Sequence, residues 1–419
     1  MYKEIEKCRI CGNPDLVPIL NLGKQSLTGV FPKRKDQIIT SGPLELVKCL
    51  EEKGKNFCGL FQLRHSYDLN ELYGEDYGYR SGLNPSMVEH LQGKVSNILN
   101  KVSVLPGDLV IDIGSNDGTL LQAYPKKGIH LVGIDPTGKK FKGYYPDHIQ
   151  LIPEFFSSAC IKARFGAKKT KVITSIAMFY DLEDPIEFME QIYEILADDG
   201  VWVFEQSYMP TMLDMNAYDT ICHEHLEYYG LKQIKWMTDR VGFKIIDVEL
   251  NSINGGSFSV MVARSNSPYH ENIALLDRVL HEEGNKGLVT LRPYEEFKER
   301  VYNCRDELCK FVQKIIAGGK VMIGYGASTK GNVILQFCNL TEKEIPFIGE
   351  VNADKFGRYT PGTHIPIISE AEAKALEPSY LVILPWHFKQ FFIQKEREYL
   401  DSGGNLVFPL PVLDVVSRR

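Results

Sequence analysis

One stretch constrains the fold more than any other: "DLVIDIGSNDGTLLQAY", residues 108–124. The apolar run before Gly114 is typical of a buried strand, and an apolar helix is expected to begin after Gly118. Glycine lets the backbone turn tightly and come close to a ligand at the helix N-terminus. A strand, a glycine turn and a helix in this order predict an α/β domain that binds a nucleotide-like ligand.

The next strand narrows the identity of that ligand. "IHLVGIDPTGKK" follows and ends in Asp135, whose carboxylate is placed to accept hydrogen bonds from two ribose hydroxyls. Asp112 ends the first strand, where it would repel the pyrophosphate of a dinucleotide but face a cationic group favourably. The pattern therefore predicts S-adenosylmethionine rather than NAD. The expected cofactor contacts are Asp112, Gly114, Ser115, Asn116, Gly118, Asp135, Pro136, Glu154, Phe155 and Ser175.

Four cysteines near the N-terminus predict a metal site. Cys8 and Cys11 form C-x2-C followed by a glycine, and Cys49 and Cys58 form C-x8-C. Two such pairs are typical of a tetrahedral zinc site, although two buried and two exposed thiols are the alternative. Four thiolates leave no open coordination position, so the zinc is expected to be structural. The insert at residues 50–56 is expected to form an elongated hairpin tip.

A second glycine turn lies in the last third of the chain. "GKVMIGYGASTKGNVILQFC", residues 319–338, repeats the strand, turn and helix, and further short apolar strands follow. Thr329 stands where the third glycine of G-x-G-x-x-G would be, so an intact NAD site is not expected. A sugar-nucleotide or purely architectural role fits better.

The fold class is thus α/β, in three parts. A four-cysteine zinc module is expected at residues 1–72, and a class I methyltransferase Rossmann-like domain at residues 73–267. A helical linker and a second Rossmann-like α/β domain are expected at residues 268–419.

Composition excludes several other classes. A net charge of −6 gives no electrostatic reason to expect nucleic acid as a partner. No apolar run is long enough to span a bilayer, and the charged N-terminus lacks the core of a signal peptide. Nine cysteines in 419 residues do not suggest a disulfide scaffold. A cytoplasmic protein that binds no membrane is expected.

The stretch "DTICHEHLEYYG", residues 219–230, concentrates groups that can move protons. His223, Glu224 and His225 are consecutive, so their side chains diverge and do not suit a tetrahedral metal site. Taken alone, the stretch is either an acid–base centre or a polar loop.

Several motifs in one order resemble the bacterial nucleotide-sugar C-methyltransferases, of which the tetronitrose C-methyltransferase is the type. These motifs are the cysteine module, "IDIGSNDGTLL", "HEHLEYYG", "NGGSF" and "GYGASTKGN", and they span essentially the whole chain. The resemblance implies methylation of C3 in a 4-keto deoxysugar carried on a nucleoside diphosphate, through an enolate. It implies His225 as the base, Glu224 and His223 as positioning or acid partners, and a tyrosine-rich segment in which Tyr77 is the first candidate.

The expected substrate contacts, also guided by the resemblance, are Tyr79, Asn84, Met87, Cys222, Asn254, Lys330, Glu350, Lys355 and Arg358. The chain departs from the family pattern in two places. Cys222 stands where the family has tyrosine, and no histidine occurs in "SIAMFYDL", residues 175–182. The sugar or the stereochemistry of methyl delivery is therefore expected to differ.

Other functions stay open at this stage. A methyltransferase with a zinc module could act on RNA or protein, and a sugar-nucleotide sensor would keep the same folds. An oxidoreductase that uses the C-terminal domain is a weaker alternative. A monomer or a weak dimer is expected.

Overall fold

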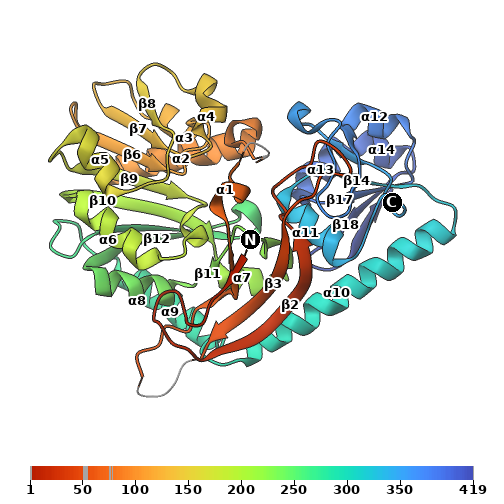
Figure 1. Ribbon diagram of the computed structural model, residues 1–419, viewed down its shortest axis with the longest axis horizontal. Coiled ribbons are helices and arrows are strands. Elements are labelled where there is room, and N and C mark those ends of the chain that lie inside the picture. Colours follow the sequence, from red (N-terminus) through yellow and green to blue (C-terminus); the bar gives the residue numbers. More distant parts are fainter. Residues whose placement is uncertain (1, 51–54, 75–76, 78, 419) are drawn as a thin grey trace.

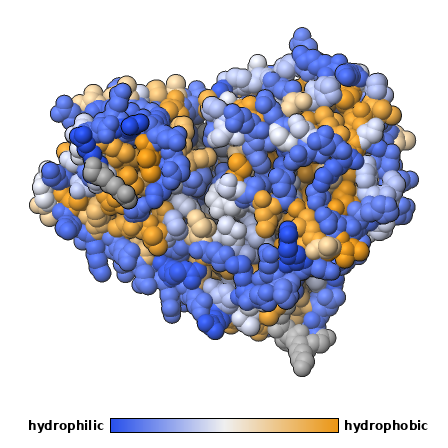
Figure 2. Space-filling view, turned by 180° about the vertical axis from the view of Figure 1, so that it is seen from behind, coloured by the Kyte–Doolittle hydropathy of each residue, from blue (hydrophilic) through white to orange (hydrophobic). Residues whose placement is uncertain are grey.

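The computed structural model describes residues 2–50, 55–74, 77 and 79–418. The tip of the expected hairpin at residues 51–54 lies outside the described residues. Two lobes, each built on its own sheet, stand side by side, with the N-terminal strands running between them (Figure 1). Seen from behind, hydrophilic side chains cover much of both lobes, and the surface is hollowed between them (Figure 2).

The first lobe contains a seven-stranded sheet in the order β12-β13-β10-β9-β6-β7-β8. Its strands are parallel except β13, which is antiparallel to both neighbours. The strand order reverses between β6 and β9, and ligands bind beyond the carboxyl ends of strands at such a point. The strands are β6 (Leu109–Ile113), β7 (His130–Ile134), β8 (Ile149–Ile152), β9 (Thr170–Ile176), β10 (Leu196–Ser207), β12 (Phe243–Asn251) and β13 (Ser257–Arg264).

Alternation along the strands gives this sheet two cores. Val110 packs on one face with α2 and α3, whereas Ile111 packs on the other face with α5, α6, α8 and α9. This buried, doubly covered sheet is a Rossmann-like α/β arrangement, as the sequence predicted. The helices of this lobe are α1 (Leu69–Leu72), α2 (Pro85–Lys101), α3 (Thr119–Gln122), α4 (Gly138–Phe141), α5 (Ser158–Phe165), α6 (Pro185–Ile195), α7 (Met209–Asp214), α8 (Leu231–Val241) and α9 (Ile273–Asn285).

The second lobe contains a six-stranded sheet in the order β16-β15-β14-β17-β18-β19, in which only β19 is antiparallel. Its strand order reverses between β14 and β17, beside the second glycine turn. The strands are β14 (Met322–Tyr325), β15 (Ile348–Glu350), β16 (Ile367–Ser369), β17 (Tyr380–Ile383), β18 (Asn405–Phe408) and β19 (Asp414–Ser417). The helices are α10 (Arg292–Ala317), α11 (Thr329–Phe337), α12 (Glu370–Ala375), α13 (Lys389–Lys395) and α14 (Arg397–Asp401).

The N-terminal strands connect the lobes. A four-stranded sheet has the order β11-β4-β3-β2, so β11, from the middle of the chain, pairs with the N-terminal strands. The β2–β3 hairpin reaches α11, where Ser26 N donates to Gln336 Oε1 over 2.7 Å and Asn332 Nδ2 donates to the Thr28 carbonyl over 2.7 Å. The strands of this sheet are β2 (Leu16–Ser26), β3 (Ser41–Cys49), β4 (Phe61–Leu63) and β11 (Glu227–Tyr228), whereas β1 (Tyr2–Glu4) and β5 (His65–Tyr67) form a separate two-stranded sheet.

The domain boundaries at residues 72 and 267 remain a proposal. Glu283 on α9, beyond the second boundary, accepts hydrogen bonds from Leu231 N and Lys232 N at the start of α8. The segment after residue 267 is therefore attached to the first lobe before the chain crosses to the second. Within the described residues, no helix is long and apolar enough to cross a bilayer.

Candidate functional site

The first glycine turn lies at the carboxyl end of β6, where the strand order of the first sheet reverses. Gly114 and Gly118 have φ of 74° and 76°, which favours glycine, and Asn116 has φ of 49°. Asp112, one residue before the end of β6, accepts a hydrogen bond from Thr174 Oγ1 over 2.6 Å. Burial raises the pKa of Asp112 to about 7.

Asp135 follows the end of β7 and holds the glycine turn in place. Its Oδ2 accepts a hydrogen bond from Asn116 N over 2.8 Å, and its Oδ1 accepts from Thr137 N and Thr137 Oγ1 over 2.7 and 2.5 Å. Burial raises the pKa of this carboxyl. Each carboxylate oxygen has further acceptor capacity, so Asp135 can bind the turn and a ligand hydroxyl together.

Three other predicted cofactor contacts lie in different surroundings. Ser175 is fully buried, and its Oγ accepts a hydrogen bond from Trp202 Nε1 over 2.8 Å. Strand alternation turns this side chain toward the core, and its contact with the cofactor stays a prediction. Glu154 is exposed and pairs with Arg164 at 2.9 Å, and the ring of Phe155 is 45% exposed.

A residue that the sequence reasoning missed packs beside the turn. Tyr145 Oη donates to the Asn116 carbonyl over 2.9 Å and lies 2.9 Å from Ser115 Oγ. A Cβ on Gly118 would lie only 3.0 Å from the Tyr145 ring, so the glycine is needed for space as well as for conformation. Pro136, between Asp135 and Thr137, is partly buried.

The segment that follows α1 docks on the same turn. Ser81 N donates to Asn116 Oδ1 and Gly82 N donates to Asp117 Oδ2, each over 2.9 Å. The carbonyl of Tyr79 accepts from Asn116 Nδ2 over 3.3 Å, while the Tyr79 side chain is exposed. The sequence carried no signal for Asp117, because its partner lies 35 residues earlier.

Two predicted substrate contacts in this segment have structural partners. Asn84 Oδ1 accepts hydrogen bonds from Ser86 N and Ser86 Oγ over 3.1 and 2.7 Å and so caps α2. Met87, near the start of α2, is buried in the core that this helix forms with the first sheet. Neither side chain has a described contact with the opposite lobe.

His225 lies in the loop between the 3-10 turn Tyr218–Thr220 and β11. Its Nδ1 lies 2.8 Å from the Thr220 carbonyl, which can only accept, so Nδ1 carries the proton and Nε2 carries the lone pair. Its ring packs against Tyr180, with centroids 4.2 Å apart. Burial, and then the positive charge of Lys330, lowers the pKa of His225 to about 3.

The two residues before His225 face other parts of the molecule. Glu224 Oε2 lies 3.4 Å from Thr28 Oγ1, while the His223 ring packs edge-on against Tyr67 with centroids 4.6 Å apart. Burial lowers the pKa of His223 to about 4. Consecutive side chains diverge, and the Thr220 carbonyl is the group that contacts His225 Nδ1. The roles of Glu224 and His223 as positioning or acid partners of His225 therefore stay a prediction.

Cys222 is buried, and burial and then the charges of Glu224 and Asp181 raise the pKa of its thiol. Tyr73 Oη donates to Asp181 Oδ2 over 2.7 Å, and the Tyr73 and Tyr77 rings lie 5.4 Å apart. Burial raises the pKa of Asp181 and that of Glu224, and the charge of Glu224 raises the pKa of Asp181 further. Asp181 was missed because nothing in "FYDL" sets it apart from a surface loop.

Lys330 brings the second lobe to this site. Its Nζ donates to the Asn254 carbonyl over 2.7 Å, so these two predicted substrate contacts meet. Burial lowers the pKa of Lys330, against the opposing charge of Asp219. Asp219 Oδ2 accepts a hydrogen bond from Trp386 Nε1 over 2.7 Å, which also joins the lobes.

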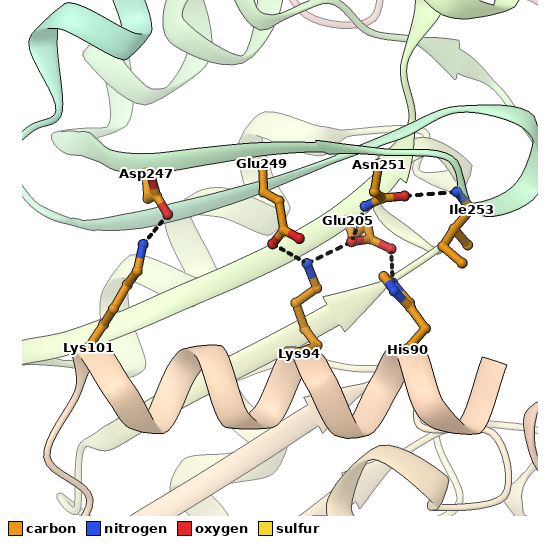
Figure 3. A network of polar contacts seen from close by, with 8 residues as sticks. All are labelled: His90, Lys94, Lys101, Glu205, Asp247, Glu249, Asn251 and Ile253. Carbon is orange, nitrogen blue, oxygen red and sulfur yellow. Dashed lines mark hydrogen bonds and ion pairs between the residues drawn. The ribbon is translucent and has the colours of Figure 1, made fainter. Parts of the chain in front are cut away.

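A polar network supports the turn that presents Asn254 (Figure 3). His90 and Lys94 on α2 contact Glu205 on β10 at 2.5 and 2.9 Å. Asn251 Nδ2 donates to Glu205 Oε2 over 3.0 Å, and Asn251 Oδ1 accepts from the backbone N–H of Ile253 over 3.0 Å. The network thereby fixes the backbone at Ile253. The carbonyl of the next residue, Asn254, accepts the hydrogen bond from Lys330.

The remaining predicted substrate contacts border the second glycine turn. Lys355 Nζ donates to the Ala327 carbonyl over 2.7 Å, and Arg358 Nη1 donates to the Phe31 carbonyl over 3.0 Å. Glu350 accepts hydrogen bonds from three backbone N–H groups, including Ala327 N at 2.7 Å. Its carboxylate therefore holds the loops at this end of the sheet.

The four N-terminal cysteines form one cluster, with all four Sγ atoms within 4.8 Å of one another. Ligand sulfurs about 2.3 Å from a tetrahedral zinc ion lie just under 4 Å apart, which fits this spacing. Leu60 N and Asn13 Nδ2 lie 3.4 Å from the sulfurs of Cys58 and Cys49 and can stabilise thiolates. Gly12, with φ of 70°, lets the chain turn after Cys11.

Families of known proteins match all three parts of the chain. Residues 87–248 match a family described as "Methyltransferase domain", and residues 252–411 match "C-methyltransferase C-terminal domain". Residues 8–73 match a family described as "Putative zinc binding domain".

Relatives cover the chain to different extents. The chain is 30% identical to C-methyltransferase NovU of Streptomyces niveus over 425 residues, which is 100% of this chain and 99% of NovU. It is 28% identical to ubiquinone biosynthesis O-methyltransferase of Actinobacillus pleuropneumoniae over 134 residues, covering 29% of this chain and 52% of that protein. The magnesium protoporphyrin IX methyltransferase structure from Synechocystis has a TM-score of 0.32 at 14% identity, covering 42% of this chain and 79% of that one.

Proposed function

The chain belongs to the C-methyltransferase family, and we propose that it methylates C3 of a 4-keto deoxysugar carried on a nucleoside diphosphate. It is an S-adenosylmethionine-dependent enzyme that methylates carbon. Its cofactors are S-adenosylmethionine, which supplies the methyl group, and a structural zinc ion. The proposed residues for the cofactor are those of the first glycine turn and Asp135.

A carbon nucleophile requires deprotonation first. A C3–H bond next to a C4 ketone is acidic because the resulting anion is delocalised onto the ketone oxygen. In the proposed step His225 Nε2 takes the C3 proton, and C3 then forms the new bond to the methyl carbon. The methyl carbon–sulfur bond breaks as that bond forms, and its electron pair leaves with S-adenosylhomocysteine.

The tautomer of His225 is the observation that carries this proposal. The Thr220 carbonyl holds Nδ1 protonated, so Nε2 keeps its lone pair in a half-buried site. The lowered pKa keeps this ring neutral at ordinary pH. It also makes the ring a weaker base, and the positive charge of Lys330 beside it favours the negative charge that develops on the enolate.

The second lobe, which carries the second glycine turn, is proposed to hold the nucleotide end of the substrate. Lys355 binds the carbonyl of Ala327 in the second glycine turn, and Lys330 lies on α11, which follows that turn. Arg358 lines the same pocket as Lys355, and all three side chains offer positive charge for phosphates. Tyr77, from the first lobe, is a second proposed contact, and its phenol is held protonated because burial raises its pKa.

A screen tests the proposed function directly. The protein is incubated with S-adenosylmethionine and a set of 4-keto-6-deoxy sugar nucleotides, and each product mixture is examined by mass spectrometry for the gain of one methyl group. Methylation at C3 of at least one sugar is expected. Methyl transfer to RNA or protein, with no sugar nucleotide methylated, would contradict the proposal.

Replacing Asp135 with alanine is expected to weaken S-adenosylhomocysteine binding by roughly 10- to 100-fold. Hydrogen bonds to charged groups contribute about 1.5–3 kcal/mol, and the change also removes the acceptor that holds Asn116. Titration calorimetry gives the dissociation constant, and Asp147→Ala, at an exposed site of the same lobe, is the control. An unchanged constant in Asp135→Ala would show that this carboxylate does not bind the cofactor.

A further inference from the structure

A small pocket opens between the two lobes, apart from the His225 loop. Arg80 and Lys140 line it from the first lobe, and Lys355 and Arg358 line it from the second. Asp354 is the one acid among its described lining residues. Four cations and one carboxylate therefore face a shared space, to which each lobe contributes two of the cations.

Backbone and aromatic groups orient these cations. Lys140 Nζ donates to the Tyr77 carbonyl over 2.8 Å. Arg80 stacks over the Tyr144 ring at 4.2 Å, and its Nε also lies 3.8 Å from Asp117 Oδ2, a carboxylate outside the pocket lining. On the opposite side, Lys355 and Arg358 donate to carbonyl oxygens, as described above. A carbonyl oxygen or an aromatic ring orients a cation but leaves its formal charge in place.

The cations also lie close enough to repel one another. Burial lowers the pKa of Lys355, Glu350 opposes this, and the positive charges of Lys140 and Arg358 lower it further. Lys140 and Arg358 belong to opposite lobes, so this repulsion acts across the interface. An anion bound between the lobes would relieve it.

We propose that this pocket binds the diphosphate of the sugar nucleotide, with Arg80 and Lys140 holding it from the cofactor side. The proposal rests on the function proposed above, and it adds two residues, Arg80 and Lys140, that the sequence did not indicate. A diphosphate carries its charge on several oxygens and can contact cations on both sides of a cleft at once. Bound there, it would bridge the two lobes and bring the sugar toward the cofactor.

The position of the pocket fits this assignment. Arg80 directly precedes Ser81 and Gly82, which bind the glycine turn of the cofactor site. Lys140 lies on α4, which begins just after the loop of Asp135 and Thr137. Phe31 and Phe141, both buried, also line the pocket.

Binding of inorganic pyrophosphate tests the pocket without knowledge of the sugar or the base. The full-length protein, loaded with S-adenosylhomocysteine, is titrated with pyrophosphate, and with a nucleoside diphosphate against its nucleoside. Lys140→Ala and Arg358→Ala are each expected to weaken pyrophosphate and nucleoside diphosphate binding about ten-fold or more. Lys139→Ala and Arg397→Ala remove exposed cations that do not line the pocket, and both should bind like the wild type.

Two outcomes overturn the assignment. The first is equal pyrophosphate affinity in the pocket variants and their controls, and the second is a nucleoside that binds as tightly as its diphosphate. The first outcome must also hold in a double variant, Arg80→Gln with Lys355→Gln, which removes one cation from each lobe, so that the remaining cations cannot compensate for a single loss. If the pocket variants bind pyrophosphate like the wild type, the pocket assignment is wrong but the proposed sugar methylation is not affected. If the pocket binds pyrophosphate but the protein methylates no sugar nucleotide, only the proposed function is wrong.

Discussion

Replacement of His225 by alanine or asparagine is expected to lower turnover by about 10²- to 10⁴-fold, the usual contribution of a positioned acid–base group. Binding of S-adenosylhomocysteine should be retained, because the glycine turn and Asp135 have no described contact with this ring. The comparison is made by steady-state kinetics on a sugar nucleotide found in the screen. His281→Asn, at an exposed position on α9, is the matched control.

Hydrogen exchange separates proton removal from methyl transfer. With S-adenosylhomocysteine in place of the methyl donor, the wild type should exchange the C3 hydrogen of the substrate with deuterated water. His225→Ala should not exchange it. If the variant exchanges at the wild-type rate and turns over within a few-fold of wild type, His225 is not the base, and Tyr77 becomes the next candidate.

The pH profile gives an independent reading of the same group. A base must be unprotonated, so activity is lost only as pH falls through its pKa in the free enzyme. The pKa of His225 is lowered to about 3, so kcat/KM should show no acid limb from this residue near its ordinary pKa of about 6.5. An acid limb at about 6.5 that disappears in His225→Asn would show that His225 titrates normally.

Features set by local sequence were predictable. The first glycine turn, the buried strand before it and the acid after β7 depend on neighbouring residues, and the structure has each of them where it was expected. The second Rossmann-like sheet follows from the same signals. The four cysteines cluster as predicted, because their number and spacing allow few other arrangements.

Features that depend on loop conformation or on distant segments were not predictable. Thr220, rather than Glu224, fixes the tautomer of His225, since a loop conformation and not residue order decides which acceptor is near. β11 pairs with β4 of the N-terminal sheet, although the paired residues Glu227 and Gln62 are 165 positions apart in the sequence (227 − 62). Arg80 and Lys140 meet Lys355 and Arg358 only because the two lobes face each other.

The same distinction applies to the departures at Cys222 and Asp181. The sequence showed that Cys222 stands where the resemblance implied a tyrosine, and a thiol is a weak hydrogen-bond donor. It did not show that Glu224 and Asp181 lie near this position, or that Asp181 accepts a hydrogen bond from Tyr73. Cys222→Ser is therefore expected to be a mild change, with enolate stabilisation carried by the neighbouring phenols.

Loss of the zinc ion is expected to destabilise more than the N-terminal strands. Cys8, Cys49 and Cys58 are buried in the same core cluster that fills one face of the first sheet. In addition, Gln233 on α8 donates to the Cys58 carbonyl over 2.9 Å. Apparent binding free energies of structural zinc in small peptides are about 10–16 kcal/mol, which sets an upper limit to the loss.

Cys8→Ser and Cys49→Ser should therefore lose the zinc that the wild type carries at about one ion per chain, the number that one four-cysteine site holds. Both variants should unfold at a clearly lower temperature than the wild type. Metal content is measured by elemental analysis, and the unfolding temperature by calorimetry. Cys160→Ser is the control, because Cys160 lies on α5 outside the four-cysteine cluster and its loss should leave the zinc in place. Full metal retention in both Cys8→Ser and Cys49→Ser would contradict the four-cysteine assignment.

If zinc is lost but S-adenosylhomocysteine still binds with wild-type affinity, the metal stabilises the N-terminal strands without shaping the cofactor site. A parallel loss of that affinity would mean that α8 transmits the change to the sheet on which the cofactor turn is built.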